Sequence, residues 1–328
     1  MHTKSRRIVA ATACALTATQ ALAEPPDQDL PTEAHESEAS EAIQELTGRP
    51  PLVTFSVSAR GDHRFKADFK DGEGDMSVSR LRGDLGVGFT IDQRTRLGLA
   101  FGHEQSRYHF GDFDLLQGVD RPLRDAYTTD FGARLSRQFD EHWGAIIGAR
   151  VEFSGESGAD LDDSATYGGL GIVTYRFSET LTVGVGAVVS TRLEDSTQLI
   201  PIVLVDVQIS DRLSFGNIDP RATAGLGIGA ALRYRLTDEW TLSLGGGYQR
   251  REYRLDNTNT ISGGVFRDSG FPIVLDTTYA PNPHFSIGAR AGAMVWHRLE
   301  LFDDDGRSLT KSELDPTPFV GFGATVRF

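Results

Sequence analysis

The residues best suited to acid–base chemistry are a few histidines beside carboxylates or aromatic rings. His103 precedes Glu104 and is followed by His109, and His297 follows Trp296. A histidine held by a carboxylate next to a serine can act as a general base for a nucleophile. On a strand, however, neighbouring residues point to opposite faces, so His103 and Glu104 would be separated. We therefore predict no catalytic residue and no cofactor, and a lipid-modifying enzyme is the least favoured class of function.

Two acidic runs, residues 160–163 and 303–306, resemble parts of cation-binding loops. Both lack the carboxylate at the far end of the loop that completes a calcium site of the EF-hand type. We expect them to be solvated loops, and we predict no metal site. The single cysteine, Cys14, lies in the N-terminal apolar stretch, which excludes thiolate chemistry from the rest of the chain.

A larger group of charged residues occurs at alternate positions of apolar segments. In residues 78–91, Arg80, Arg82 and Asp84 fall on one face of a strand, opposite Leu81 and Leu85. If such strands close into a barrel, this face lines an aqueous lumen, where rings of charge bias ion selectivity. The candidate lumen-lining charges are Arg80, Arg82, Asp84, Arg134, Arg150, Glu152, Arg233, Arg235 and Arg290. The excess of arginine favours anions; an internal ion-pair network without a transport role is the alternative.

The elements that must carry these charges are strands joined into hairpins. Short turns follow alternating segments at 92–93, 140–142, 178–180, 210–211, 237–239 and 281–283. Longer polar connections lie between them, including 111–121, 155–164, 256–269 and 302–315. With an opening strand near 52–60 and a closing strand at 317–328, these hairpins give about 14 strands, with 12 as the fallback because residues 199–219 are compact.

Alternation by itself does not distinguish a membrane barrel from a soluble β-sandwich. The alternation also predicts that Arg192, Arg251 and Arg298 face the lumen, on strands 181–192, 240–251 and 284–298. On strand 223–236 it predicts that Gly225, Gly227 and Gly229 face the lumen. Aromatic residues beside the short turns, such as Trp143 and Trp240, favour the barrel because they would form a girdle at a lipid interface. We therefore predict an all-β, transmembrane, antiparallel up-and-down barrel.

The alternation is most regular in residues 317–328, where Val320, Phe322, Ala324, Val326 and Phe328 share one face. This segment resembles the closing strand of bacterial outer-membrane β-barrels, whose C-terminal Phe is read by the barrel-assembly machinery. The resemblance implies that Phe322, Val326 and Phe328 form an assembly signal and that this machinery is a partner.

The N-terminal region has the pattern of an export signal. Lys4, Arg6 and Arg7 precede an apolar stretch, and the small-x-small site ending at Ala23 predicts cleavage there, so residues 1–23 are a signal peptide. Residues 24–49 are rich in acids and predict a disordered periplasmic tail, with residues 50–328 forming the barrel. Helical spacing of apolar residues between 39 and 46 leaves a short plug of the lumen as the alternative.

The net charge of the chain bears on which partners it can bind. The net charge is −13, and removing residues 1–23, which hold three basic and no acidic residues, makes it −16. Nucleic acid is therefore excluded as a favoured partner.

The stretch from Leu232 to Leu242, with Tyr-Arg-Leu-Thr-Asp-Glu-Trp at 234–240, resembles a repeated hairpin of an uncharacterised family of Gram-negative-type bacterial outer-membrane β-barrels, a domain of unknown function. The similarity continues through Ile209–Leu213 and Gly288–Trp296. It implies a barrel in the outer membrane, in contact with its lipid, and we expect this barrel to be a monomer. The function we predict is a narrow or gated porin-like channel for small solutes; a non-conducting structural or surface-interaction barrel is the alternative.

Overall fold

The computed structural model of the chain describes residues 52–194, 196–217 and 228–328. The predicted signal peptide, the acidic tail with its possible plug, and the inner face predicted for residues 223–227 lie outside these ranges. The described residues contain no helix that is long and apolar enough to cross a membrane.

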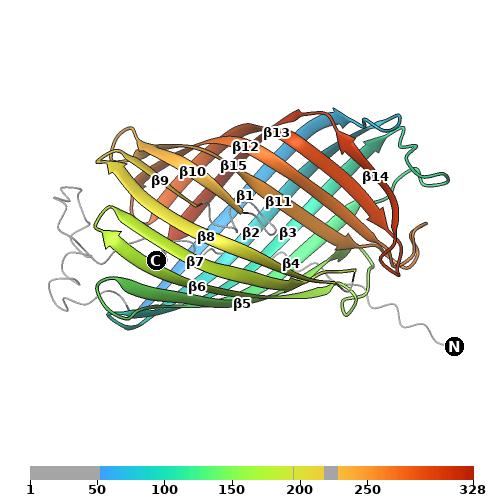
Figure 1. Cartoon of the computed structure of the whole chain (residues 1–328). Coiled ribbons are helices and arrows are strands. Elements are labelled where there is room, and N and C mark those ends of the chain that lie inside the picture. Colours follow the sequence, from blue (N-terminus) through green and yellow to red (C-terminus); the bar gives the residue numbers. More distant parts are fainter. Residues whose placement is uncertain (1–51, 195, 218–227) are drawn as a thin grey trace.

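Consecutive antiparallel strands form one closed barrel (Figure 1). The strands are β1 (Val53–Asp68), β2 (Asp75–Asp92), β3 (Thr95–Gly111), β4 (Asp125–Gln138), β5 (Trp143–Glu156), β6 (Ala165–Ser178), β7 (Leu181–Thr191), β8 (Thr197–Ser210), β9 (Leu213–Asn217), β10 (Ile228–Arg235), β11 (Trp240–Arg254), β12 (Val265–Asn282), β13 (Phe285–Phe302), β14 (Ser308–Leu314) and β15 (Thr317–Arg327). The barrel closes where β15 pairs with β1, from Ser56↔Arg327 to Arg64↔Phe319. Closure satisfies both edges of the sheet, which a sandwich would leave open.

The barrel has fourteen strands because β14 and β15 are two parts of one wall strand. Both pair with β13, β14 at residues 297–302 and β15 at residues 285–294. The break falls at Pro316, which has no backbone N–H to donate. The prediction of fourteen strands is therefore confirmed, and each predicted short turn joins two strands of the barrel.

One of the short turns shows how local sequence directs the chain back. Asp140 accepts hydrogen bonds from the backbone N–H groups of Trp143 and His142, each 2.8 Å long. These bonds stabilise the charged carboxylate and hold the pKa of Asp140 below its usual range. An Asp at the start of a turn thus replaces backbone pairing at the hairpin tip.

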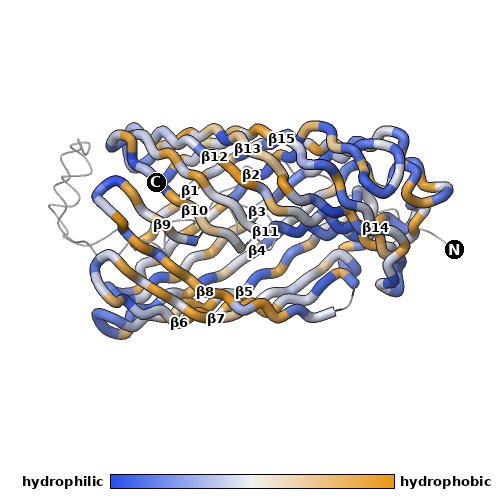
Figure 2. The backbone as a smooth tube through the Cα atoms, turned by 45° about the horizontal axis from the view of Figure 1, so that its top comes forward, coloured by the Kyte–Doolittle hydropathy of each residue, from blue (hydrophilic) through white to orange (hydrophobic). Residues whose placement is uncertain are grey.

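The outer surface of the barrel is an apolar band. Leu81, Val185 and Phe322 are 63%, 62% and 69% exposed, and all three point away from the interior. Aromatic pairs flank the short turns, with ring centroids 4.8 Å apart for both Trp143–Tyr175 and Trp240–Tyr279. Figure 2 shows the apolar colouring running along the wall, most densely over β5 to β8.

The other end of the barrel, the long-loop end, differs from the prediction in two places. The predicted connection 256–269 is shorter, because β12 begins at Val265; the predicted connection 302–315 contains β14. The opening strand also extends beyond 60, to Asp68. These extra residues lengthen the wall well past the roughly 10 residues that a membrane crossing needs.

The lengthened wall narrows and is filled by an apolar core. At the long-loop end β11 meets β5 through a single parallel pair, Arg254↔Gly155, so strands β6 to β10 are excluded from the narrow part. The loop 112–124 between β3 and β4 contributes Phe113, Val119 and Leu123. From the wall come Met76, Val78, Tyr108, Tyr253, Phe266, Leu299 and Leu301, among others. We call this cluster the apolar plug.

Candidate functional site: the barrel interior

Ion pairs between strands that are not neighbours identify the side chains that point into the interior. Arg80 on β2 contacts Asp268 on β12 at 2.7 Å, although β1, β15 and β13 lie between these strands. Arg251 on β11 contacts Glu104 on β3 at 2.9 Å. Such contacts can form only through the space that the barrel encloses.

Asp268 is the centre of the innermost cluster, which lies directly beneath the apolar plug. Its carboxylate accepts hydrogen bonds from Arg80 at 2.7 Å and from the hydroxyl of Tyr108 at 2.9 Å. His297 Nε2 lies 2.8 Å from Asp268 Oδ1, and Arg64 Nη1 lies 3.5 Å from Oδ2. The side chains of Asp268, Arg64 and Arg80 are each 2% exposed. Asp268 thus compensates Arg64 and, together with Asp62 at 3.6 Å, Arg80.

A second cluster joins four of the predicted lumen charges through a fifth residue, Asp130. Arg82 donates to Asp84 at 2.6 Å and to Asp130 at 2.7 Å. Arg150 contacts Asp130 at 3.3 Å and also pairs with Glu152. A Cβ on Gly102 would overlap the guanidinium of Arg82, so any other residue there would force this paired side chain to move.

The remaining predicted charges lie nearer the short turns and are not brought together. Arg290 pairs with Asp276 at 3.1 Å, with side chains 31% and 34% exposed. Arg233 donates to the carbonyl of Asn217 at 3.0 Å, and Arg235 to that of Asp211 at 2.8 Å. Arg134 shares the inner face of β4 with Asp130. This half of the interior therefore holds partly exposed charges, whereas the half beneath the plug is closed.

A family model described as "Domain of unknown function (DUF6268)" matches residues 127–325, from within β4 into the closing strand β15. The chain belongs to this family. The DUF6268 match covers the C-terminal part of the barrel, where the sequence pattern of the hairpins indicated it.

Solved structures with a similar fold are bacterial outer-membrane barrels. An outer membrane channel from Pseudomonas putida F1 has 12% identity and a TM-score of 0.47, over 85% of this chain and 97% of that one. A deltaS2 mutant of TodX, a monoaromatic hydrocarbon channel, has 9% identity and a TM-score of 0.47, over 86% and 92%. A Pseudomonas aeruginosa FadL homologue has 13% identity and a TM-score of 0.43, over 84% and 90%. These similarities concern the barrel fold alone. No curated protein matches the chain.

In this DUF6268 barrel, Arg298 was predicted to face the lumen but lies on the outer face. Arg298 stacks over Trp296 and donates to Glu313 at 3.0 Å on the outer side. The register shifts between Phe271 and Pro272, so Trp296 pairs with the first and Met294 with the second. This β-bulge inserts one residue into β13 and reverses the faces beyond it. His297 consequently points inward and is fully buried.

Sequence reasoning assigned Arg80 to the lumen but missed its partners in the innermost cluster, above all Asp268. The segment Val265–Gly270 is buried on both faces, so it does not alternate, and its Asp, Ser and Gly are typical of a turn. Arg64 lies beyond the predicted end of its strand at residue 60, whereas Tyr108 precedes the predicted connection 111–121 but was not assigned to the lumen. Tyr108 has the same parity along its strand as Glu104, which was predicted to point inward, and this was a signal that could have placed it inside.

The two histidines considered for catalysis lie on opposite faces of the wall, His103 outside and His297 inside. His103 forms a hydrogen bond of 2.9 Å with the Thr129 hydroxyl on the outer side, whereas Glu104 pairs with Arg251 inside. The predicted separation of His103 from Glu104 is therefore confirmed. His297 contacts Asp268 and Arg64, both of which serve the buried charge cluster.

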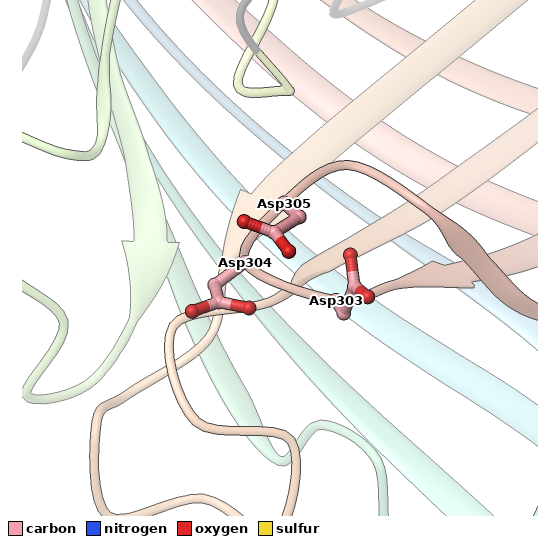
Figure 3. A group of neighbouring side chains, drawn as sticks. All are labelled: Asp303, Asp304 and Asp305. Carbon is pink, nitrogen blue, oxygen red and sulfur yellow. The ribbon is translucent and has the colours of Figure 1, made fainter.

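The acidic run 303–305 forms the turn between β13 and β14 (Figure 3). Carboxylate oxygens of its three aspartates lie within 4.8 Å of one another. Arg307 contacts Asp305 at 2.6 Å and Asp303 at 3.7 Å, and its backbone N–H donates to Asp303. The turn thus supplies its own counter-charge and backbone donor.

Proposed function

We propose that this protein is a gated channel for small solutes in the bacterial outer membrane. The observation that carries the proposal is the asymmetry of the interior. Towards the short turns, Arg290 and Asp276 remain about a third exposed. At the long-loop end the plug is dry, with Leu123, Tyr253 and Phe266 at 0% exposure. Part of that plug is a loop, and a loop can move out of a lumen more readily than strand side chains can.

The competing function is a structural or surface-interaction barrel that conducts nothing. Swelling of proteoliposomes in small neutral solutes separates the two. A gated channel gives slow swelling above that of protein-free liposomes, and the rate falls steeply with solute size. Rates equal to the protein-free background, from protein shown to be folded, support the non-conducting barrel.

The arginines of the exposed half favour anions in the open state. The double substitution Arg233→Gln and Arg290→Gln is expected to move the anion-to-cation permeability ratio towards unity, because it removes two fixed positive charges from the lumen. The reversal potential across a salt gradient reports this ratio. Arg307→Gln, at a side chain 75% exposed in an outer turn, is the control and should leave the ratio unchanged.

The outer-membrane location and the assembly signal are part of the same proposal. Phe328 is 70% exposed, while its backbone pairs with Phe55 through bonds of 2.8 and 3.1 Å that help close the barrel. Phe328→Ala keeps these backbone bonds and removes only the ring. We expect the outer-membrane level of the protein to fall several-fold in cells, as measured by membrane fractionation. Phe177→Ala, an aromatic 62% exposed on β6, is the control; an equal fall for both would contradict a role specific to the C-terminus.

A further inference from the structure

The end of the lumen at the short turns, which we call the mouth, is rich in arginine. One lateral row of paired residues leads there from Arg80, which points inward. The row consists of Arg80, Asp62, Gly321, Arg290, Asp276, Ser243 and Arg233, each paired with the next. Directly paired residues project from the same face of a sheet. Arg290 and Arg233 therefore face the lumen, as Arg80 does.

Four more arginines share these inner faces. Arg235 has the parity of Arg233, and Arg134 has that of Asp130. Arg96 pairs with Ser136, which has the parity of Arg134, and Arg176 has the parity of Gly168, the partner of Arg150. Each of the six lies within five residues of the end of its strand at a short turn. We call the following six residues the mouth arginines: Arg96, Arg134, Arg176, Arg233, Arg235 and Arg290.

Few carboxylates face these arginines. In this half of the barrel, Asp206 and Asp276 are the inward carboxylates of the described strands, apart from Asp92 at a turn, which accepts the backbone N–H of Arg94. Asp276 pairs with Arg290 at 3.1 Å. A Cβ on Gly216 would lie 3.3 Å from Arg233 Nη1 and 3.4 Å from Asp206 Oδ1, so those two charges are neighbours. Both inward carboxylates are therefore matched by an arginine already.

Three mouth arginines are left without such a partner. Arg96, Arg176 and Arg235 form no salt bridge with a carboxylate of the described residues. Arg235 donates to the backbone carbonyl of Asp211 instead. The other acids at this end lie in the short turns, where they are exposed to water. The inner surface of the mouth thus carries uncompensated positive charge.

An apolar surface adjoins the mouth arginines. Leu170 on β6 pairs with Gly148, which shares the inner face of β5 with Arg150, so Leu170 faces the lumen. On that face of β6, Ile172 lies four residues from Arg176. Apolar area left in contact with water costs about 25 cal/mol per Å², so a lumen that only holds water does not call for it. We call this surface on β6, β7 and β8 the inner apolar wall: Leu170, Ile172, Val188, Ile200, Ile202 and Leu204.

The chain before β1 has the complementary composition. Residues 24–49, which we call the acidic segment, hold eight acidic residues and one arginine, with apolar residues at 39, 42, 43 and 46. The described chain begins at Leu52, whose carbonyl accepts the backbone N–H of Thr90 at 3.0 Å, near the short turn between β2 and β3. The acidic segment is therefore tethered at the mouth.

The tether is long enough for the segment to reach the mouth arginines. The seven residues from Glu45 to Leu52 span up to about 25 Å. Arg290, the mouth arginine furthest from its turn, lies five residues from the start of β13, or about 17 Å along the strand. A short flexible tether also keeps the local concentration of the segment on the order of millimolar. Weak contacts are therefore sufficient for occupancy.

We propose that the acidic segment binds inside the mouth of its own barrel, with its carboxylates on the mouth arginines and its apolar residues on the inner apolar wall. The contact is mainly electrostatic, so it is released in about 1 M salt, where the Debye length is about 3 Å. The proposal goes beyond the channel function and does not require it, because the segment can bind whether or not the barrel conducts.

Protection of an introduced thiol tests the proposal in the full chain. Cys14, the only cysteine, is replaced by serine, and Ser243→Cys places a thiol between Arg233 and Asp276. Its reaction with N-ethylmaleimide, which is small and neutral, is timed at about 50 mM salt. We expect the reaction to be several-fold slower than in a chain whose acidic segment carries Glu33→Gln, Glu36→Gln, Glu38→Gln and Glu41→Gln. The difference should disappear at about 1 M salt.

Three further variants separate the proposed contact from other effects of charge. A thiol from Ser210→Cys, exposed in a short turn, should react equally in both chains. Arg176→Gln combined with Arg235→Gln should remove most of the protection at position 243. The same change in net charge, made at exposed acids of the long-loop end, should leave the protection in place: Glu73→Gln, Asp120→Asn, Asp162→Asn and Asp304→Asn.

Equal rates at position 243 with and without the acids of the segment would overturn the proposal, as would protection that persists in about 1 M salt. Protection that rises with the protein-to-lipid ratio would assign the bound acids to a second copy of the chain, which also overturns it. Ile202→Cys should be protected in the same way, and a thiol there that is unaffected would disprove the contact with the inner apolar wall. Failure of the channel function, in contrast, would appear as absent conductance with protection intact.

Discussion

Leu123→Ala is expected to raise the open probability of the channel by at least about 30-fold. Leu123 is 0% exposed and belongs to the loop of the apolar plug. Truncating a buried leucine costs about 2 to 5 kcal/mol, and each 1.4 kcal/mol is about tenfold in an equilibrium. If the open state is the one in which the loop leaves the lumen, that cost falls on the closed state alone. Single-channel recording in planar bilayers measures the change.

The control for this substitution is Leu81→Ala. Leu81→Ala removes the same side-chain volume as Leu123→Ala, but Leu81 is 63% exposed on the outer surface. It should leave the open probability near that of the unaltered protein. Similar gating in both variants would show that the plug does not close the lumen.

Asp268→Asn is expected to destabilise the barrel by about 3 to 5 kcal/mol, because Arg64 would remain buried without a carboxylate and Arg80 would keep only the longer pair with Asp62, at 3.6 Å. Both arginine side chains are 2% exposed, so water cannot replace the carboxylate. Asparagine has nearly the same shape, so the effect reports charge rather than packing. Reversible urea unfolding in lipid vesicles gives the free energy of unfolding.

Asp276→Asn is the matched control for Asp268→Asn. Asp276 pairs with a single arginine, Arg290, and both are about a third exposed. Removing such a solvated pair costs at most about 1 kcal/mol. A loss for Asp276→Asn as large as that for Asp268→Asn would contradict the distinction between a buried charge cluster and a water-filled half of the lumen.

The strand order of this barrel could be predicted from sequence because most of the wall separates lipid from an aqueous interior. That separation forces apolar and polar residues to alternate, as Leu81 and Arg82 do, and marks each hairpin tip with residues such as Asp140. The signal disappears in Val265–Gly270, where both faces are buried. The predicted connection there was wrong for that reason.

The inner face could be predicted strand by strand, but the contacts across the lumen could not. Periodicity assigns Arg80 to a face and says nothing about Asp268, which lies 188 residues further along the chain. Apart from the proline, the sequence around Phe271 and Pro272 does not indicate a β-bulge. The bulge places Arg298 on the outer face and His297 on the inner face, the reverse of what alternation predicts. The apolar plug was missed because its loop residues, such as Phe113 and Leu123, are scattered in a polar segment.

Single-channel conductance of the refolded protein shows whether a polar lumen is closed at one end by a displaceable plug. We expect a closed baseline interrupted by brief, uniform, anion-favouring openings in the unaltered chain, and frequent openings in Leu123→Ala. A steady open conductance in the unaltered chain, or silence in both proteins when each is shown to be folded, would contradict it.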